Sequence, residues 1–404
     1  MDTLADTAVF LDPKSVQYPH VALLVETSTS FGRRVLQGIS LYLREHGPWA
    51  VFAEQRSLYD PAPPWLKNWQ GDGIISRAAY PELAELIVKS GVPAVDLNDQ
   101  VVGLGLPWIR NDHEAIGRMA ATHLLERGFT RFGFVGHPGI YWSEARWRGF
   151  AETIQGMGWQ CDAFRATGHT RPRYHQRSWE QEMDNMAAWL RLLPKPVGLL
   201  ACNDYHALQV LEACHRANVT VPEEIAVIGV DDEEVAYQLT NPPLSSVVPN
   251  ALEIGYQAAA MLTALMQGKE LPEREVLVPP TGIVTRRSTD ITAISDAKVA
   301  VALGFIRQNA CRGIDVDDVL RRVLVSRSVL QRRFQKAIGK PIHAVILAER
   351  MRRVKDLLVE TQLPRDRIAR QTGFDHPEYL SRIFRQHTGM TMSGYRREYG
   401  RKSR

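Results

Sequence analysis

The stretch that decides the fold of the C-terminal part of this chain is Ile368-Ala-Arg-Gln-Thr-Gly-Phe-Asp-His-Pro-Glu-Tyr-Leu-Ser-Arg-Ile-Phe-Arg-Gln-His-Thr-Gly389. It predicts two short helices around a tight turn, in which Gly373 supplies a positive φ and Pro377 opens the second helix. Leu380 and Phe384 then recur at helical spacing as an inward face. The outward face carries Glu378, Tyr379, Arg382 and Arg385. Such a basic face suits the major groove of DNA, although a solvated surface helix has the same pattern.

A second copy of this pattern lies 50 residues earlier, in Val319–Gly339. There Leu330 and Phe334 take the places of Leu380 and Phe384. The outward face of this first unit would carry Arg327, Ser328, Gln331, Arg332 and Gln335. The repeat therefore predicts two helix-turn-helix units of the same kind.

We expect the two units at about residues 315–339 and 365–389, joined by a helix that Pro341 opens and that runs to about Glu360. Two units held by one rigid helix can present their recognition helices to successive turns of the major groove, about 34 Å apart. Arginine reads guanine through two hydrogen bonds, and glutamine can read adenine. The pattern therefore predicts a double-stranded DNA operator with tandem half-sites as a partner.

The charge of the chain is divided unevenly between its parts. Residues 296–404 hold 24 Lys and Arg against 11 Asp and Glu, whereas residues 1–295 hold 25 against 34. The formal net charge of +4 hides this asymmetry. A basic C-terminal part on an acidic body is typical of a nucleic-acid-binding module joined to another domain. The alternative is a basic tail without specificity, which the helical periodicity argues against.

The C-terminal module resembles the AraC/XylS-type DNA-binding domain. The resemblance rests on Ile368-Ala-x4-Gly-Phe374, on Tyr379-Leu-x-Arg-x-Phe384 and on Gly389-x-Thr391. It covers about Ala297 to Tyr399, within a domain that we expect at residues 297–404. One departure is Met392, where the family usually has proline before the closing helix. The resemblance implies a transcription activator, with RNA polymerase as a further partner.

The N-terminal part alternates short apolar strands with amphipathic helices. Helices such as Arg33–His46 separate the strands, which are expected at Val21–Val25, Trp49–Ala53, Gly73–Ser76, Pro93–Leu97, Phe132–Val135, Gly198–Ala201 and Ile225–Val230. Alternation of this kind predicts parallel sheets covered by helices on both faces. Residues 20–289 are too many for one such sheet, so we expect an α/β domain of two lobes with a cleft between them, followed by an all-α domain.

Polar and aromatic side chains follow several of these strands, where ligands of parallel α/β folds bind. The candidate ligand residues are Thr27, Phe31, Asp112, Tyr141, Trp142, Arg146, Asn203, Asp204 and Asp231. Planar polar groups match adjacent sugar hydroxyls, and aromatic rings match the C–H face of a sugar. Each residue also has a structural alternative: Asp112 and Asp204 as helix caps, Asp231 in a turn, Trp142 in the core. The convergence at several strand ends favours a small polyhydroxylated ligand.

The same part resembles the LacI/GalR-type sensor, a periplasmic-binding-protein-like domain that binds sugars or purines. The resemblance rests on Arg146-Trp-Arg-Gly-Phe150, Ala201-Cys-Asn-Asp204 and Ile225-Ala-Val-Ile-Gly-Val-Asp-Asp232, among other pieces. It implies that Arg146, Asn203 and Asp231 contact the ligand. The DNA-binding headpiece that precedes the sensor in that family does not fit into the N-terminal residues 1–19, which we expect to be frayed.

The order of the parts, a sugar sensor, a linker at residues 290–296 and an AraC-type module, resembles that of xylose-operon activators. This resemblance implies a homodimer in which sugar, D-xylose in particular, re-orients the DNA-binding modules. The alternative is a regulator of the same architecture that responds to a different sugar or small polar metabolite.

Several other classes of protein are disfavoured. The chain has no apolar run long enough to span a membrane and no signal-peptide pattern, which favours a cytoplasmic protein over a solute-binding protein for uptake. Its 4 cysteines form no metal-ligand pattern. We find no nucleophile elbow, no phosphate-cradling loop and no metal motif, so an enzyme, such as a hydrolase using paired carboxylates, is disfavoured, and no cofactor or metal is expected.

Overall fold

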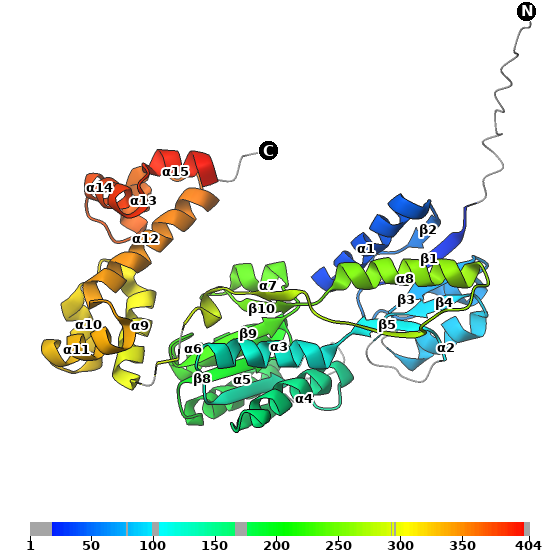
Figure 1. Ribbon diagram of the computed structural model, residues 1–404, viewed down its shortest axis with the longest axis horizontal. Coiled ribbons are helices and arrows are strands. Elements are labelled where there is room, and N and C mark those ends of the chain that lie inside the picture. The colour runs from blue at the N-terminus through cyan, green and yellow to red at the C-terminus, as the bar shows by residue number, and fades with distance from the viewer. Residues whose placement is uncertain are drawn as a thin grey trace, which may run out of the picture.

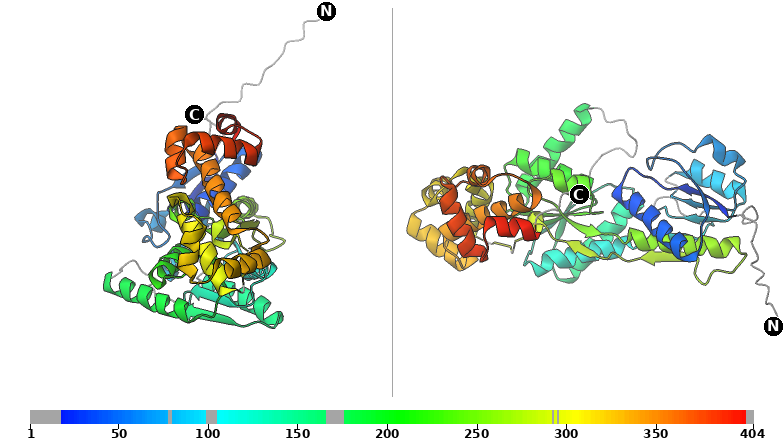
Figure 2. Two further views of the ribbon diagram at one scale, coloured as in Figure 1. Left: turned by 90° about the vertical axis from the view of Figure 1, so that its left-hand side faces the viewer. Right: turned by 90° about the horizontal axis from the view of Figure 1, so that it is seen from above.

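The computed structural model describes residues 18–77, 80–98, 105–165, 176–291, 293–294 and 296–399. Two α/β lobes and a helical domain follow one another along the molecule (Figure 1). The helical domain lies against the C-terminal lobe, and the N-terminal lobe lies at the far end, as a second view confirms (Figure 2). Apart from residues 18 and 19, the N-terminal segment expected to be frayed lies outside the described residues.

The N-terminal lobe is built on a six-stranded sheet in the order β11-β5-β4-β3-β1-β2. All of its strand pairs are parallel. Its strands are β1 (His20–Leu24), β2 (Ala50–Ala53), β3 (Gly73–Ser76), β4 (Ala94–Asp96), β5 (Trp108–Asn111) and β11 (Glu275–Val278). Its helices are α1 (Ser30–His46), α2 (Pro81–Ser90) and α8 (Ala251–Met266), with a 3-10 turn η1 (Pro64–Asn68). Val35 and Ile39 of α1 share the core with Ile254 of α8.

The C-terminal lobe repeats this plan with the order β12-β10-β9-β8-β6-β7. Only β12 among these described strands is antiparallel to its neighbour. Its strands are β6 (Phe132–Gly136), β7 (Cys161–Arg165), β8 (Val197–Ala201), β9 (Ile225–Val230), β10 (Ser245–Val248) and β12 (Gly282–Val284). Its helices are α3 (His113–Glu126), α4 (Tyr141–Gly156), α5 (Gln176–Leu192), α6 (Asp204–Ala217) and α7 (Glu234–Leu239), followed by the 3-10 turn η2 (Arg287–Thr289).

The chain passes between the lobes at three places within the described residues: at Asp112, at residues 249–250 and at residues 279–281. Each passage is only a few residues long. Short multiple connections of this kind join lobes that can close on a ligand while each lobe stays rigid.

The central strands lie where the alternation predicts them, and β3 and β9 match the expected ranges to the residue. Five strands were not predicted from the sequence: β5, β7, β10, β11 and β12. Most of them are at or near a sheet edge, and they are short or carry polar residues, so their sequences lack the continuous apolar run of a buried parallel strand.

The helical domain has two cores that share one long helix. Its helices are α9 (Ala297–Asn309), α10 (Val316–Val323), α11 (Arg327–Ile338), α12 (Ile342–Glu360), α13 (Arg365–Gln371), α14 (Pro377–Thr388) and α15 (Met392–Tyr399), with a 3-10 turn η3 (Ala310–Arg312) after α9. Ile342 and Ile346 of α12 pack in the first core, while Val354 and Leu357 pack in the second. One rigid helix therefore holds both helix-turn-helix units, α10–α11 and α13–α14, as expected.

Each of the two turns contains one residue with a positive φ, but the residue differs in type and position. In the second unit Gly373 has φ +74°, as expected, and Phe374 fills the core beside it. His376 stands at the N-cap of α14, but its side chain makes no capping hydrogen bond. In the first unit Leu324 takes the left-handed conformation, with φ +54° and 83% of its surface exposed. Leucine pays a steric penalty at a position that glycine tolerates.

Candidate functional site

The loop after β9 lies at the boundary between the lobes and contains two residues with unusual backbone conformations. Asp231 and Asp232 have φ values of +107° and +51°, which are strained for residues with a side chain. Asp204, the first residue of α6, binds this loop and is 1% exposed. One oxygen of Asp204 accepts from the Glu233 N–H (2.7 Å), and the other accepts from the Ser246 hydroxyl (2.7 Å). Burial raises the pKa of Asp204 well above its ordinary value.

Arg146 is the centre of the predicted ligand residues in the C-terminal lobe. Its side chain is buried, with the residue 4% exposed, and donates to the Cys202 carbonyl and to Nδ1 of His113 (3.3 Å). It also pairs with Oδ1 of Asp231 at 3.5 Å, and its guanidinium lies 5.1 Å from the centre of the Trp142 ring. The fold thus brings Arg146 and Trp142 of α4, which follows β6, together with Asp231, which follows β9.

The other predicted ligand residues in this lobe make structural contacts, but among them only Asp112 takes the structural alternative given for it; Asp204 does not cap α6. Asn203 caps α6, accepting from the His206 N–H at 2.9 Å. Asp112 caps α3, accepting from the Ala115 N–H at 2.7 Å. Asp204 lies within the lobe, as described above. Tyr141 is exposed at the start of α4 and meets the His113 ring edge-on.

In the N-terminal lobe, the predicted residues lie beside charged groups that the sequence reasoning did not single out. Thr27 exchanges hydrogen bonds with the backbone of Arg56, and Phe31 lies under the guanidinium of Arg77 (4.6 Å to the ring centre). Arg77 forms an ion pair with the buried Glu26. Arg77 directly follows β3, so the rule that finds polar residues at the carboxyl ends of strands would have found it.

Several buried polar atoms at the carboxyl ends of this sheet have no hydrogen-bond partner among the described residues, and two of them are carboxylate or amide oxygens. They are Oε2 of Glu26, which follows β1, and Oδ1 of Asn111, which ends β5. Buried polar atoms are normally paired, and an unpaired one needs an explanation. Both atoms suit a ligand that donates hydroxyl groups.

The two lobes contact each other through charged groups of the β9–α7 loop. Glu233 is 3% exposed and accepts from the N–H (2.7 Å) and hydroxyl (2.8 Å) of Ser30, the first residue of α1. Arg33 lies 3.5 Å from the same carboxylate. Arg34 reaches Asp232 at 3.3 Å. A carboxylate at the N-terminus of a helix is stabilised by the helix dipole, so these contacts favour a closed arrangement of the lobes.

Within the described residues no group of three or more His, Cys, Asp and Glu side chains is arranged to hold a metal ion. None of the described helices combines the length and the apolarity that crossing a bilayer requires.

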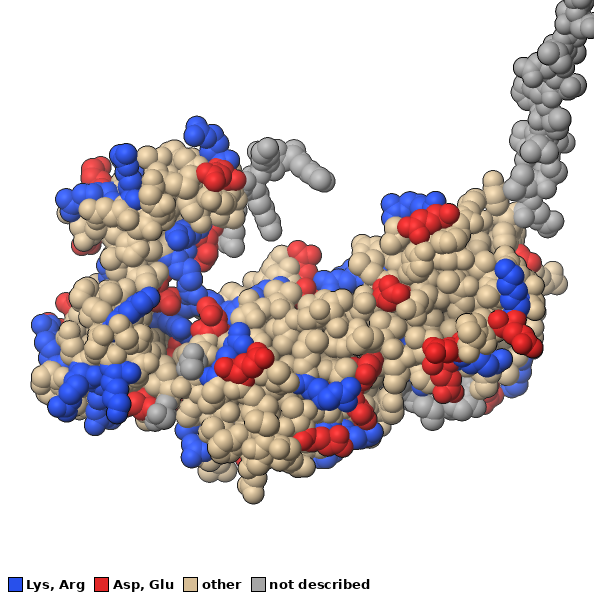
Figure 3. Space-filling model, in the orientation of Figure 1, with Lys and Arg blue, Asp and Glu red and all other residues tan. Residues whose placement is uncertain are grey.

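The second candidate site is the outward face of the two recognition helices. Every predicted DNA-contacting residue of α11 and α14 is exposed: Arg327, Ser328, Gln331, Arg332, Gln335, Glu378, Tyr379, Arg382 and Arg385. Leu330 and Phe334, and their counterparts Leu380 and Phe384, are buried on the inner faces. Lys and Arg side chains gather over the α10–α11 end of the domain (Figure 3).

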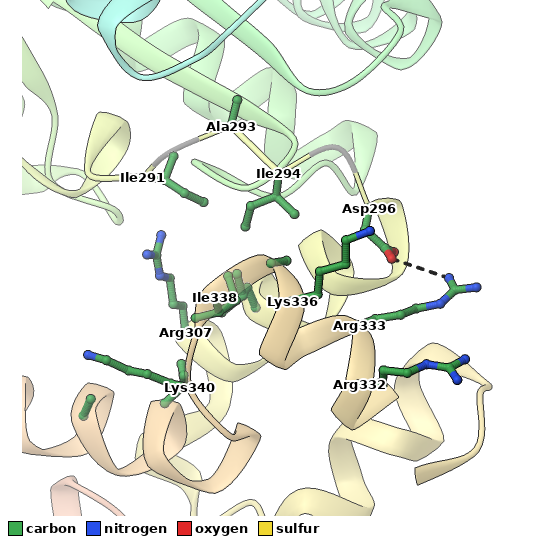
Figure 4. Close-up of a pocket in the computed structure, with 14 residues that line it drawn as sticks. Ile291, Ala293, Ile294, Asp296, Arg307, Arg332, Arg333, Lys336, Ile338 and Lys340 are labelled. Carbon is green, nitrogen blue, oxygen red and sulfur yellow. Dashed lines mark ion pairs between the residues drawn. The ribbon is translucent and has the colours of Figure 1, made fainter. Parts of the chain in front are cut away.

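Neighbouring side chains hold some of these basic groups in place. Arg382 lies over the Tyr379 ring (5.3 Å), and Arg327 pairs with Asp317 (2.8 Å). Arg333, one residue after Arg332, pairs with Asp296 at the end of the linker (3.6 Å). Figure 4 shows Arg333 directed toward Asp296, while Arg332 extends from the helix without a drawn ion pair. Arg332 is therefore exposed, whereas its neighbour Arg333 is held toward the linker by Asp296.

Models of three known families match successive parts of this chain. The XylR N-terminal domain matches residues 20–102, a periplasmic binding protein-like domain matches residues 121–289, and a helix-turn-helix domain matches residues 319–398. Together they cover both lobes and most of the helical domain.

The same order of parts occurs in full-length relatives. The chain is 32% identical over 386 residues to the xylose operon regulatory protein of Escherichia coli (strain K12), covering 93% of this chain and 96% of that protein. It is 31% identical over 388 residues to the protein of that name from Haemophilus influenzae, covering 94% and 98%. The solved structure of the xylose-binding transcription activator XylR matches with a TM-score of 0.81 and 30% identity, over 95% of this chain and 99% of that one.

A periplasmic binding protein/LacI transcriptional regulator from Alkaliphilus metalliredigens, solved with D-xylulofuranose, matches with a TM-score of 0.52 and 20% identity. It covers 69% of this chain and 100% of that one, and at this identity it shows the fold of the two lobes alone.

Proposed function

This chain belongs to the family of xylose operon regulatory proteins, and from that premise we propose that it activates genes of xylose utilisation when D-xylose binds between its lobes. It is a sugar-responsive, sequence-specific DNA-binding transcription regulator and not an enzyme. Because a transcription regulator acts on DNA, we expect the protein in the cytoplasm, at the nucleoid when it is bound to DNA.

The observation that carries the ligand proposal is a set of buried and partly buried polar groups at the carboxyl ends of strands from both lobes. Arg146 and Asp231 come from the C-terminal lobe, and the unpaired acceptors of Glu26 and Asn111 come from the N-terminal lobe. A guanidinium and a carboxylate each bind two adjacent hydroxyls, and Trp142 supplies a flat apolar face. The hydroxyl groups of a pentose placed here would donate hydrogen bonds to the unpaired oxygens of the N-terminal lobe. Other hydroxyl groups would bind Arg146 and Asp231 of the C-terminal lobe.

A ligand that contacts both lobes binds the closed arrangement more tightly than an open one. Only such a difference in ligand affinity can shift the equilibrium between open and closed lobes. Closure would re-orient the helical domains of a homodimer, so that both engage tandem half-sites beside RNA polymerase. Within each helical domain, α11 and α14 would enter successive major-groove turns with Arg332 and Arg382 as base-reading residues.

Calorimetric titration of the purified protein with a panel of pentoses and hexoses tests the effector. Heat on addition of D-xylose is the expected result, and a clear response to another sugar with none to D-xylose would replace the effector. In a parallel experiment, the affinity for a duplex selected from a random pool should rise with D-xylose. That affinity should also fall steeply with salt, because Lys and Arg release counterions from DNA. A salt-independent affinity contradicts the DNA-binding mode.

A further inference from the structure

We propose that the contact between the C-terminal lobe and helices α9 and α12 carries ligand-driven lobe movement to the DNA-binding domain. We call it the docking contact, and this coupling role rests on the proposed function. The contact is formed by Thr220, Glu223 and Arg287 of the sensor and by Gly304, Arg307 and Glu349 of the helical domain.

The first part of the docking contact is steric. A Cβ atom built on Gly304 of α9 would lie 2.6 Å from Cγ2 of Thr220 and 2.8 Å from its Cβ. Real Cβ atoms do not approach other carbons this closely, so the helix can seat on the lobe only because residue 304 is glycine. Glycine is unfavourable within a helix, so its presence here is explained by the close approach.

The second part is an ion network with a buried centre. Glu223 of the sensor has a fully buried side chain (0% exposed) and lies 2.7 Å from Nη1 of Arg307 on α9. Arg307 also reaches Glu349 of α12 (3.4 Å), and the other oxygen of Glu349 receives Arg287 of the sensor (3.4 Å) and Arg352 (2.5 Å). Glu349 thus connects two sensor elements with two helices of the DNA-binding domain.

The network continues to the lobe boundary through two adjacent residues. Arg286, which precedes Arg287, donates to Oδ1 of Asp232 (2.7 Å) and lies over the Tyr237 ring (3.7 Å). The other oxygen of Asp232 receives Arg34 of the N-terminal lobe (3.3 Å). A change in lobe spacing therefore acts directly on the Asp232–Arg286 pair, and the backbone passes it to Arg287 and Glu349.

The docking contact is polar and incompletely packed. A cavity of about 1150 Å³ adjoins it and is lined by Arg286, Arg307 and Glu349, among others. Polar interdomain contacts commonly permit domain movement, whereas large apolar ones do not. The helical domain is thus held firmly enough to follow the lobe, through ion pairs that can exchange partners.

The test compares full-length variants by the ratio of DNA affinities with and without D-xylose, using a duplex selected on the wild type. Gly304→Ala adds one methyl group and favours the helix, so it perturbs docking without weakening α9. Glu349→Gln removes the charge at the centre of the network. The matched controls are Gly156→Ala, where a Cβ meets open space, and Glu85→Gln, which breaks an exposed ion pair in the N-terminal lobe. Hydrogen exchange of α9 reports docking independently.

We expect both variants to bind D-xylose as the wild type does, to exchange faster in α9, and to lose about fivefold or more of the affinity ratio, an effect within the usual range of allosteric coupling. The controls should keep the full ratio. An unchanged ratio in both variants despite faster exchange in α9 would show a purely structural contact and overturn the inference. If no pentose changes the DNA affinity of the wild-type protein, the proposed function is overturned, and the coupling role with it.

Discussion

Glu233 accepts two hydrogen bonds from Ser30 across the lobe boundary, one from the backbone N–H at 2.7 Å and one from the hydroxyl at 2.8 Å. The two residues belong to different lobes and are 203 positions apart in the chain. The pair places a carboxylate on the N-terminus of α1, where an anion is favoured. It is the most direct link between the lobes and the basis of the first prediction.

Glu233→Gln should weaken D-xylose binding about tenfold, because hydrogen bonds to a charged group contribute about 1.5–3 kcal/mol and closure would lose part of this. Calorimetry measures the change. Glu234→Gln is the control, since Glu234 bonds only to the exposed Gln238 one helical turn away among the described contacts. Equal affinities of the two variants would show that the pair does not stabilise the ligand-bound state.

Arg146→Lys should reduce D-xylose affinity by about 100-fold, or about 3 kcal/mol. A lysine ammonium cannot reproduce the planar fork that reaches the Cys202 carbonyl, His113 and Asp231 together. Arg148→Lys on the same helix is the control, because Arg148 is exposed and pairs with Glu114 at the surface. Retention of wild-type affinity by Arg146→Lys would remove Arg146 from the ligand site.

Arg332→Ala and Arg382→Ala should each lower discrimination between the selected duplex and a single-base variant by about 1–3 kcal/mol, the value of one lost base contact. Lys336→Ala is the contrast: we expect this exposed lysine of α11 to contact phosphate and no base, so its loss should weaken binding to all duplexes alike and reduce the salt slope by about one. Fluorescence anisotropy over a series of single-base variants separates the two patterns. If both arginine variants weaken binding to all duplexes equally, Arg332 and Arg382 contact phosphates and not bases.

The stability of the sensor should fall as pH decreases from about 6.5 toward 4, in part because of His123. Burial, with the nearby Arg127 adding to it, lowers the pKa of His123 to about 4, and Nε2 lies 2.9 Å from the Thr289 hydroxyl. The unfolded chain binds a proton below its ordinary pKa of 6.5, while the folded chain does not. Protonation therefore favours unfolding in this window, by about 1.4 kcal/mol per pH unit.

His123→Gln should flatten this dependence by that amount. Denaturant unfolding followed by tryptophan fluorescence is a suitable measurement, because all 9 tryptophans precede residue 190 and report on the sensor alone. His206, whose pKa burial lowers to about 3, contributes a slope of the same sign in wild type and variant, so the difference isolates His123. Parallel curves for the two proteins would contradict the assignment.

Local sequence determined the elements and faces that depend on short-range patterns. The spacing of Leu380 and Phe384 predicted the buried face of α14, and Gly373 predicted the left-handed turn before it. Strand β9 was found because a strand buried on both faces needs a continuous apolar run. These features follow from periodicity and backbone sterics, which act within one helix or strand, so the residues themselves specify them.

The tertiary structure alone decided which strand-end residues meet. Asp204 and Asn203 satisfy backbone groups of their own lobe, whereas Arg146 pairs with Asp231 from a distant strand. The pairs Ser30–Glu233 and Glu223–Arg307 join parts of the chain that no local pattern relates. A polar side chain can cap a helix, brace a loop or face a ligand with equal local propensity. Its partner is fixed only when lobes and domains pack, because burial makes an unpaired polar group costly.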